Sequence, residues 1–258
     1  MILKHKNISI NYSVEGEGEA VVLLHGFLEN LKMWNDLIPV LCKNHKIISI
    51  DLLGHGKTEC LGYLHTMEDM ADAVHAVLFQ LKIGKAKFVG HSMGGYVALA
   101  LAEKEPQLFN GLCLMNSTFE ADDKERRLLR TRAIKMATTN YNNLVRMSFA
   151  NLFAPESKLR FKQAYDIALQ SALQTPVQGY IAAQEGMKRR PNRFEAFKAI
   201  KGEKLIITGK KDTLIDPETI AEKISNTSIV QEELSEGHMS HIENKSELTY
   251  IIKHFIEK

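Results

Sequence analysis

The stretch AKFVGHSMGGYVALALAEKEP, residues 86–106, decides the fold. A short apolar run typical of a buried strand is followed, after one turn, by good helix formers that end before Pro106. Gly90, Ser92 and Gly94 fit the pattern G-x-S-x-G at the turn. Small residues two positions before and after the serine allow a tight turn that strains the serine backbone and lifts its hydroxyl out of the sheet. The sequence therefore predicts that Ser92 is a nucleophile.

Apolar runs and helical patterns alternate along the rest of the chain, which is typical of a mostly parallel sheet covered by helices on both faces. The pattern predicts an α/β fold. We expect strands at residues 8–14, 20–25, 46–51, 86–90, 111–115, 204–208 and 228–234. Helices are expected at residues 67–81, 93–105 and 246–257.

Residues 119–199 interrupt this alternation with a series of helical segments and no convincing strand. So many successive helices predict a helical cap inserted into the α/β core, which residues 1–118 and 200–258 would form. Additional helices that flank the core are the alternative interpretation.

The composition narrows the possible partners and location. A length of 258 residues is sufficient for one substantial core. The net charge of +2 is too small to indicate nucleic-acid binding. Three cysteines without metal-ligand spacing indicate a reduced compartment, and no apolar window is long enough for a signal peptide or a membrane span. We expect a cytoplasmic monomer or homodimer with neither a nucleic-acid nor a membrane partner.

Further segments make the chain similar to the α/β-hydrolase family. LLHGFLENLKMW, residues 23–34, resembles the family's oxyanion loop, which implies that the backbone N–H groups of Phe27 and Met93 form the oxyanion hole. DLLGHGKT, residues 51–58, resembles a structural loop of the family, so Asp51 and His55 are not expected to be catalytic.

The resemblance also implies the two partners of Ser92. LIITGKKDTLIDPE, residues 205–218, places Asp212 where the family has its triad acid. SEGHMSHIE, residues 235–243, resembles the segment with the family's base and implies that His238 has this role. The order serine, aspartate, histidine is that of the fold. Other acids and bases are less well placed, namely Asp122, Asp123, Asp216, His91 and His241.

A triad of this kind implies a serine hydrolase that cleaves a small carboxylic ester or lactone through an acyl-enzyme, without metal or organic cofactor. The resemblance is to enol-lactonase-like and carboxylesterase-like members. A C–C bond hydrolase or a lyase like the menaquinone-pathway synthase remains an alternative, and a perhydrolase or a non-catalytic ligand-binding protein is a weaker one.

The cap offers candidates for substrate contacts. Apolar side chains expected to line the pocket are Met136, Met147, Phe149, Phe153, Tyr165 and Met187, although packing within the cap is the alternative for each. The cap is also basic, and one or two of its arginines are expected to hold a substrate carboxylate while the others face solvent. The candidates include Arg126, Arg127, Arg130, Arg132, Arg189, Arg190 and Arg193.

Overall fold

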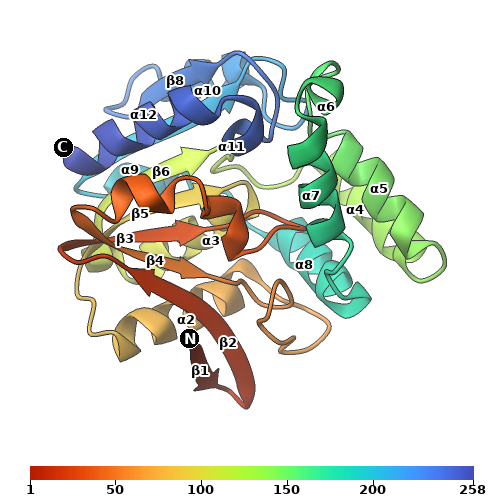
Figure 1. Ribbon diagram of the computed structural model, residues 1–258, viewed down its shortest axis with the longest axis horizontal. Helices are drawn as coiled ribbons and strands as arrows, with labels where there is room; N and C mark the ends of the chain where they lie inside the picture. Colours follow the sequence, from red (N-terminus) through yellow and green to blue (C-terminus); the bar gives the residue numbers. More distant parts are fainter.

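An eight-stranded sheet runs through the computed structural model, which describes residues 1–258 (Figure 1). The strand order is β1-β2-β4-β3-β5-β6-β7-β8. The pairs β1–β2 and β2–β4 are antiparallel, and all pairs from β4 to β8 are parallel. The strands are β1 (Ile2–His5), β2 (Ile8–Glu15), β3 (Glu19–Leu24), β4 (His45–Ile50), β5 (Ala86–His91), β6 (Phe109–Met115), β7 (Glu203–Gly209) and β8 (Val230–Leu234). The predicted α/β fold with a mostly parallel sheet is confirmed.

Helices cover both faces of this sheet. The helices outside the cap are η1 (Leu31–Trp34), α1 (Ile38–Leu41), α2 (Met67–Gln80), α3 (Met93–Lys104), η2 (Pro106–Leu108), α9 (Phe194–Ala199), α10 (Pro217–Ile224), α11 (Ser240–Glu243) and α12 (Lys245–Glu257). Along β3, Val22 and Leu24 belong to the apolar cluster under α2 and α3, whereas Val21 and Leu23 belong to the cluster under α12. Alternate side chains of a strand point to opposite faces, so a doubly covered strand must be apolar throughout.

Strand β1 was not expected from the sequence. It has only four residues at the edge of the sheet, and their side chains alternate between exposed and half-buried. Such a short edge strand has too little apolar surface to stand out in the sequence. None of the helices is long and apolar enough to cross a membrane.

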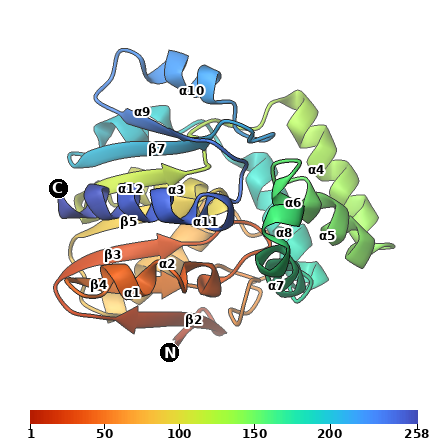
Figure 2. The same ribbon diagram turned by 45° about the horizontal axis from the view of Figure 1, so that its top comes forward.

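The cap helices lie beside the end of the sheet toward which the parallel strands point (Figure 2). They are α4 (Lys124–Ala137), α5 (Tyr141–Ala150), α6 (Ser157–Arg160), α7 (Lys162–Ala172) and α8 (Val177–Arg189). A separate apolar cluster joins these helices and includes Leu144, Phe149 and Tyr180. Helix α9 lies within the residues expected to form the cap, but it packs against α3, and Phe197 belongs to the main core cluster.

A buried carboxylate links the beginning and the end of the cap. Asp122 is fully buried and pairs with Arg130 of α4 and with Arg190, which follows α8. The Arg190 guanidinium also lies 3.9 Å from the ring centre of Tyr96 in α3. Burial raises the pKa of Asp122, but the two arginines outweigh this effect and lower it below the ordinary value.

One or two cap arginines were predicted to hold a substrate carboxylate, and the ion pairs of the structure exclude some of the candidates. Arg130 and Arg190 are committed to Asp122, and Arg193 pairs with Glu68 and Glu103. Arg127, Arg132 and Arg189 are exposed at the surface. Arg126 donates to the Leu214 carbonyl oxygen. The ion pairs of Arg130, Arg190 and Arg193 leave these three side chains unavailable for a substrate carboxylate.

Replacement of Asp122 by alanine is expected to lower the free energy of unfolding by about 3 kcal/mol, because it leaves two arginines without their buried counter-charge. Chemical denaturation would measure the change. The matched control is Asp123→Ala, which removes only the N-cap hydrogen bond to Arg126 N and is expected to lower stability by about 1 kcal/mol. Equal losses in the two variants would contradict the role assigned to Asp122.

Candidate active site

Ser92 occupies the turn between β5 and α3 in a strained backbone conformation. Its φ is 48° and its ψ is −113°, a region that non-glycine residues rarely adopt. The two flanking glycines are required by space. A Cβ on Gly90 would lie 2.6 Å from Gly95 Cα, and one on Gly94 would overlap the carbonyl oxygen of Leu24. The sharp turn therefore depends on close backbone contacts that larger residues cannot make.

Ser92, His238 and Asp212 come together from the loops that follow β5, β8 and β7. The Ser92 Oγ lies 2.9 Å from His238 Nε2, and His238 Nδ1 lies 2.7 Å from Asp212 Oδ2. Because a carboxylate only accepts hydrogen bonds, Nδ1 carries the proton and Nε2 accepts one from the serine hydroxyl. Ser92 is partly accessible, whereas the other two side chains are buried. This arrangement can remove a proton from the serine as it attacks a substrate.

Asp212 is held by donors on both of its oxygens. The Oδ1 accepts from Leu214 N at 2.8 Å and from Ile215 N at 3.2 Å, and the Oδ2 accepts from Asn116 Nδ2 at 3.1 Å. Burial raises the pKa of Asp212, but the adjacent His238 and these hydrogen bonds outweigh burial and lower it. Asp212 is therefore ionised at neutral pH.

Asn116 orients the acid, and the sequence analysis missed it. It follows β6 directly with a φ of 44°, and its Oδ1 accepts from the Ser240 hydroxyl at 2.6 Å. Its Nδ2 also donates to the Gly237 carbonyl oxygen at 3.2 Å, next to His238. A polar residue at the carboxyl end of a central strand was the available signal, because ligands and catalytic side chains gather at that edge of a parallel sheet.

The backbone N–H groups of Phe27 and Met93 have no acceptor within the protein. Met93 is the first residue of α3, and the Phe27 loop abuts Ser92, since a Cβ on Gly26 would lie 3.2 Å from Ser92 Cβ. His25 fixes that loop by accepting from Leu52 N at 2.9 Å. Two free donors beside a nucleophilic serine can stabilise the negative charge that develops during acyl transfer.

The six apolar side chains predicted to line the pocket have different surroundings, and for four of them the lining of a substrate pocket stays a prediction. Phe149, Phe153 and Tyr165 pack together inside the cap, and Met187 belongs to the main core cluster. The prediction is wrong for two methionines. Met136 and Met147 are 43% and 63% exposed, because α4 and α5 bury other side chains against the rest of the cap.

Two aromatic rings meet between the core and the cap. The ring of Phe27, whose N–H is a candidate oxyanion donor, lies 4.9 Å from the ring of Tyr180. A cavity of about 1220 Å³ is lined by residues close to the triad, such as Met239, but by none of the three triad residues. Its walls include Leu28, Glu29, Phe149 and His241.

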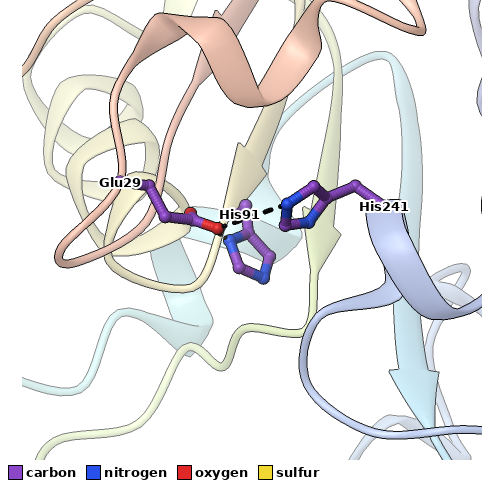
Figure 3. Close-up of side chains that lie close together, drawn as sticks. All are labelled: Glu29, His91 and His241. Atoms are coloured by element: carbon purple, nitrogen blue, oxygen red, sulfur yellow. Dashed lines mark hydrogen bonds and ion pairs between the residues drawn. The ribbon is translucent and has the colours of Figure 1, made fainter. Parts of the chain in front are cut away.

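The buried Glu29 and His91 and the half-buried His241 form a cluster next to the triad (Figure 3). One potential metal-ligand atom from each lies within 4.8 Å of the others. His91 Nδ1 is 2.6 Å from Glu29 Oε2, and His91 Nε2 is 3.0 Å from the carbonyl oxygen of His238. A metal ion at this position would have to displace the hydrogen bond between His91 and Glu29.

The rival acids and bases have other contacts. Asp216 is the N-cap of α10 and accepts from Thr219 N, and Asp123 caps α4. Asp51 accepts from Leu31 N and Lys57 N, both at 2.8 Å, and thus joins two loops. His55 is buried, and burial lowers its pKa to about 3. None of these side chains contacts Ser92.

Comparisons with known proteins agree with the α/β fold. A family model described as alpha/beta hydrolase fold matches residues 19–245. The 3-oxoadipate enol-lactonase 1 of Acinetobacter baylyi is 24% identical over 255 residues, which are 98% of this chain and 94% of that protein. A thermophilic esterase from Thermogutta terrifontis has a TM-score of 0.90 and 26% identity, with 97% of this chain and 93% of that chain covered.

Another relative matches over a shorter region. The (E)-2-((N-methylformamido)methylene)succinate hydrolase of Acinetobacter baylyi is 28% identical over 127 residues, or 49% of this chain. The match spans 48% of the length of that curated relative.

Proposed function

Because this chain belongs to the α/β hydrolase fold family, we propose that it is a serine hydrolase that cleaves a small carboxylic ester or lactone. The observation that carries the proposal is the complete relay of Ser92, His238 and Asp212, with hydrogen bonds of 2.9 and 2.7 Å. The free N–H groups of Phe27 and Met93 supply the remaining component that acyl transfer requires.

The reaction proceeds in two halves. His238 Nε2 takes the proton of Ser92 as Oγ attacks the substrate carbonyl carbon, and Asp212 stabilises the imidazolium that forms. The oxyanion accepts hydrogen bonds from Phe27 N and Met93 N. The protonated histidine then gives its proton to the alkoxide as the bond between the carbonyl carbon and the alcohol oxygen breaks. The alcohol departs, and the acyl group remains bound to Ser92 Oγ. Water, activated by the same histidine, releases the acid in the second half.

The names of two relatives support an anionic substrate as the finer proposal. One acts on an enol-lactone of 3-oxoadipate and the other on a substituted succinate, so both names contain dicarboxylic acids. The succinate derivative is named neither as an ester nor as a lactone, which keeps cleavage of another bond type by the same triad as a second candidate.

A fluorophosphonate probe followed by peptide mass spectrometry tests the proposed nucleophile. We expect stoichiometric labelling of Ser92 in the wild-type protein, because the probe traps activated serines. A folded protein that is not labelled and does not hydrolyse any ester would contradict the proposal.

A substrate series tests the finer assignment. p-Nitrophenyl acetate, butyrate and octanoate would measure the length of acyl chain that fits, and a lactone would test ring opening. Matched neutral and carboxylated esters would measure selectivity for charge. Equal kcat/KM values for the matched pair would argue against an anionic substrate.

A further inference from the structure

Glu29 and His91 form a buried pair that the reaction described above does not use (Figure 3). Their side chains are 6% and 2% exposed, and His91 directly precedes Ser92 in the chain. Glu29 lies in the loop that carries Phe27, and its Oε2 also accepts from Gly26 N at 2.7 Å. The pair therefore contacts the oxyanion loop on one side and the nucleophile turn on the other.

The contacts of His91 determine its protonation. Its Nδ1 faces the Glu29 carboxylate at 2.6 Å, and its Nε2 faces the carbonyl oxygen of His238 at 3.0 Å. Both partners only accept hydrogen bonds, so a neutral ring would direct one lone pair at an oxygen atom. An imidazolium satisfies both contacts, and the Glu29 carboxylate balances its buried charge.

The hydrogen bonds form one continuous chain across the site. Gly26 N donates to Glu29, Glu29 accepts from His91, and His91 donates to the backbone of His238. The chain thus connects the loop of one oxyanion donor with the residue that acts as the base. Each of these loops must hold its position relative to Ser92 within a fraction of an ångström for efficient reaction.

We propose that Glu29 and His91 are positioning residues, an ion pair that fixes the oxyanion loop and the backbone of His238 on either side of Ser92. This inference rests on the proposed hydrolase function. His91 does not contact the reacting atoms; it acts through the carbonyl oxygen of the base.

The pair has a defined pH range. Burial lowers the pKa of His91, but the charge and hydrogen bond of Glu29 outweigh burial and raise it. Burial raises the pKa of Glu29, but His91 outweighs burial and lowers it to about 2. Because the pKa of His91 is raised, the stability that its protonated ring contributes to the fold is fully present below the ordinary pKa of 6.5. This stability is lost as the pH rises through the higher pKa of the folded state.

Other titratable groups surround His91 and define the charge it experiences. The Nε2 of His241 lies 3.7 Å from Glu29 Oε1. Burial lowers the pKa of His241 to about 4, so this histidine is neutral at pH 7. The ring centre of His238 is 5.2 Å away. His25 and Asp212 also act on the cluster through their charges. Glu29 is thus the carboxylate in direct contact with the imidazolium.

NMR of protein labelled with ¹⁵N-histidine tests the charge state without any substrate. We expect both His91 ring nitrogens to be protonated at pH 7, with the signal assigned by its absence in His91→Gln. In Glu29→Gln the amide can donate to Nδ1, so we expect a neutral ring at pH 7. A neutral His91 in the wild type would overturn the proposal, whether or not the protein hydrolyses esters.

Kinetics test the positioning role. His91→Leu removes the donor to His238 and is expected to lower kcat about 10- to 100-fold with KM within about twofold. His91→Gln keeps one donor and should recover part of this loss. The matched control is His241→Gln, which changes a second, half-buried histidine beside Glu29 and is expected to keep kcat within about twofold of wild type.

Two results would overturn the positioning role. The first is a His91→Leu variant with the same kcat and pH profile as the His241→Gln control. The second is zinc binding that raises the Tm of the wild type but not of His241→Gln, because the cluster would then be a metal site rather than an ion pair. An absence of ester hydrolysis in every variant would instead count against the hydrolase function, and the NMR result would remain valid.

Discussion

Replacement of Ser92 by alanine is expected to lower kcat for p-nitrophenyl esters by about 10⁴- to 10⁶-fold. The change removes the nucleophilic Oγ and leaves His238 with no group to deprotonate at 2.9 Å. The Tm should change little, because only one hydrogen bond of about 1 kcal/mol is lost and the backbone strain at a φ of 48° is the same for both residues. Steady-state kinetics would measure kcat, fluorophosphonate labelling would report the loss of the activated serine, and thermal unfolding would measure the Tm.

A nearby serine, Ser117, provides the control for this variant. Ser117 is buried and donates to the carbonyl oxygen of Ser92 at 2.7 Å, so its hydroxyl is directed away from His238. Ser117→Ala is expected to lower kcat less than about tenfold and to keep the probe on Ser92. Turnover that survives in Ser92→Ala, or a probe found on another serine, would mean that the nucleophile lies elsewhere.

Each member of the triad occupies a short strand-to-loop segment. Ser92 was predicted from its own strand, glycine-flanked turn and helix, whereas Asp212 and His238 were implied by the resemblance of their segments to those of the α/β-hydrolase family. Parallel strands bring their carboxyl ends to one edge of the sheet. Three residues that are far apart in sequence were therefore predicted to meet, and the structure places them within hydrogen-bonding distance.

Contacts that depend on tertiary packing could not be predicted in this way. Asn116 meets Asp212 across 96 positions and His91 meets Glu29 across 62, and no pattern within either segment identifies the partner. The orientation of helix α4 in the cap could not be predicted from its sequence either. Only Ala137 of that helix is buried, whereas Leu128, Leu129 and Met136 are exposed, so the apolar residues in its sequence do not identify the face that packs.

Replacement of Asp212 by asparagine is expected to lower kcat about 10⁴-fold while KM changes little. The amide oxygen can keep the hydrogen bonds from Leu214 N and Ile215 N, which places the amide nitrogen against His238. That nitrogen donates, so His238 Nδ1 becomes the acceptor and Nε2–H points at Ser92 Oγ. The histidine then holds its proton on the nitrogen that must accept one.

The pH dependence of the protein's stability follows from the lowered pKa of Asp212. A carboxyl group with a depressed folded-state pKa contributes to stability above its ordinary value of 3.8, and this contribution is lost as the pH falls through the lower value. The Asn variant lacks this contribution, so the difference in Tm between wild type and variant should shrink in acid. Thermal unfolding as a function of pH would measure it.

Asp216→Asn is the matched control, because Asp216 lies four positions further along the same loop and caps α10 through Thr219 N. It is expected to keep kcat within about twofold of wild type. If Asp212→Asn kept more than about a tenth of the wild-type kcat, a different acid would have to orient His238. Asp122 could not replace it, because both of its oxygens are held by Arg130 and Arg190. Retained activity would therefore mean that a carboxylate other than Asp212 and Asp122 orients His238, and the third member assigned to the relay would be wrong.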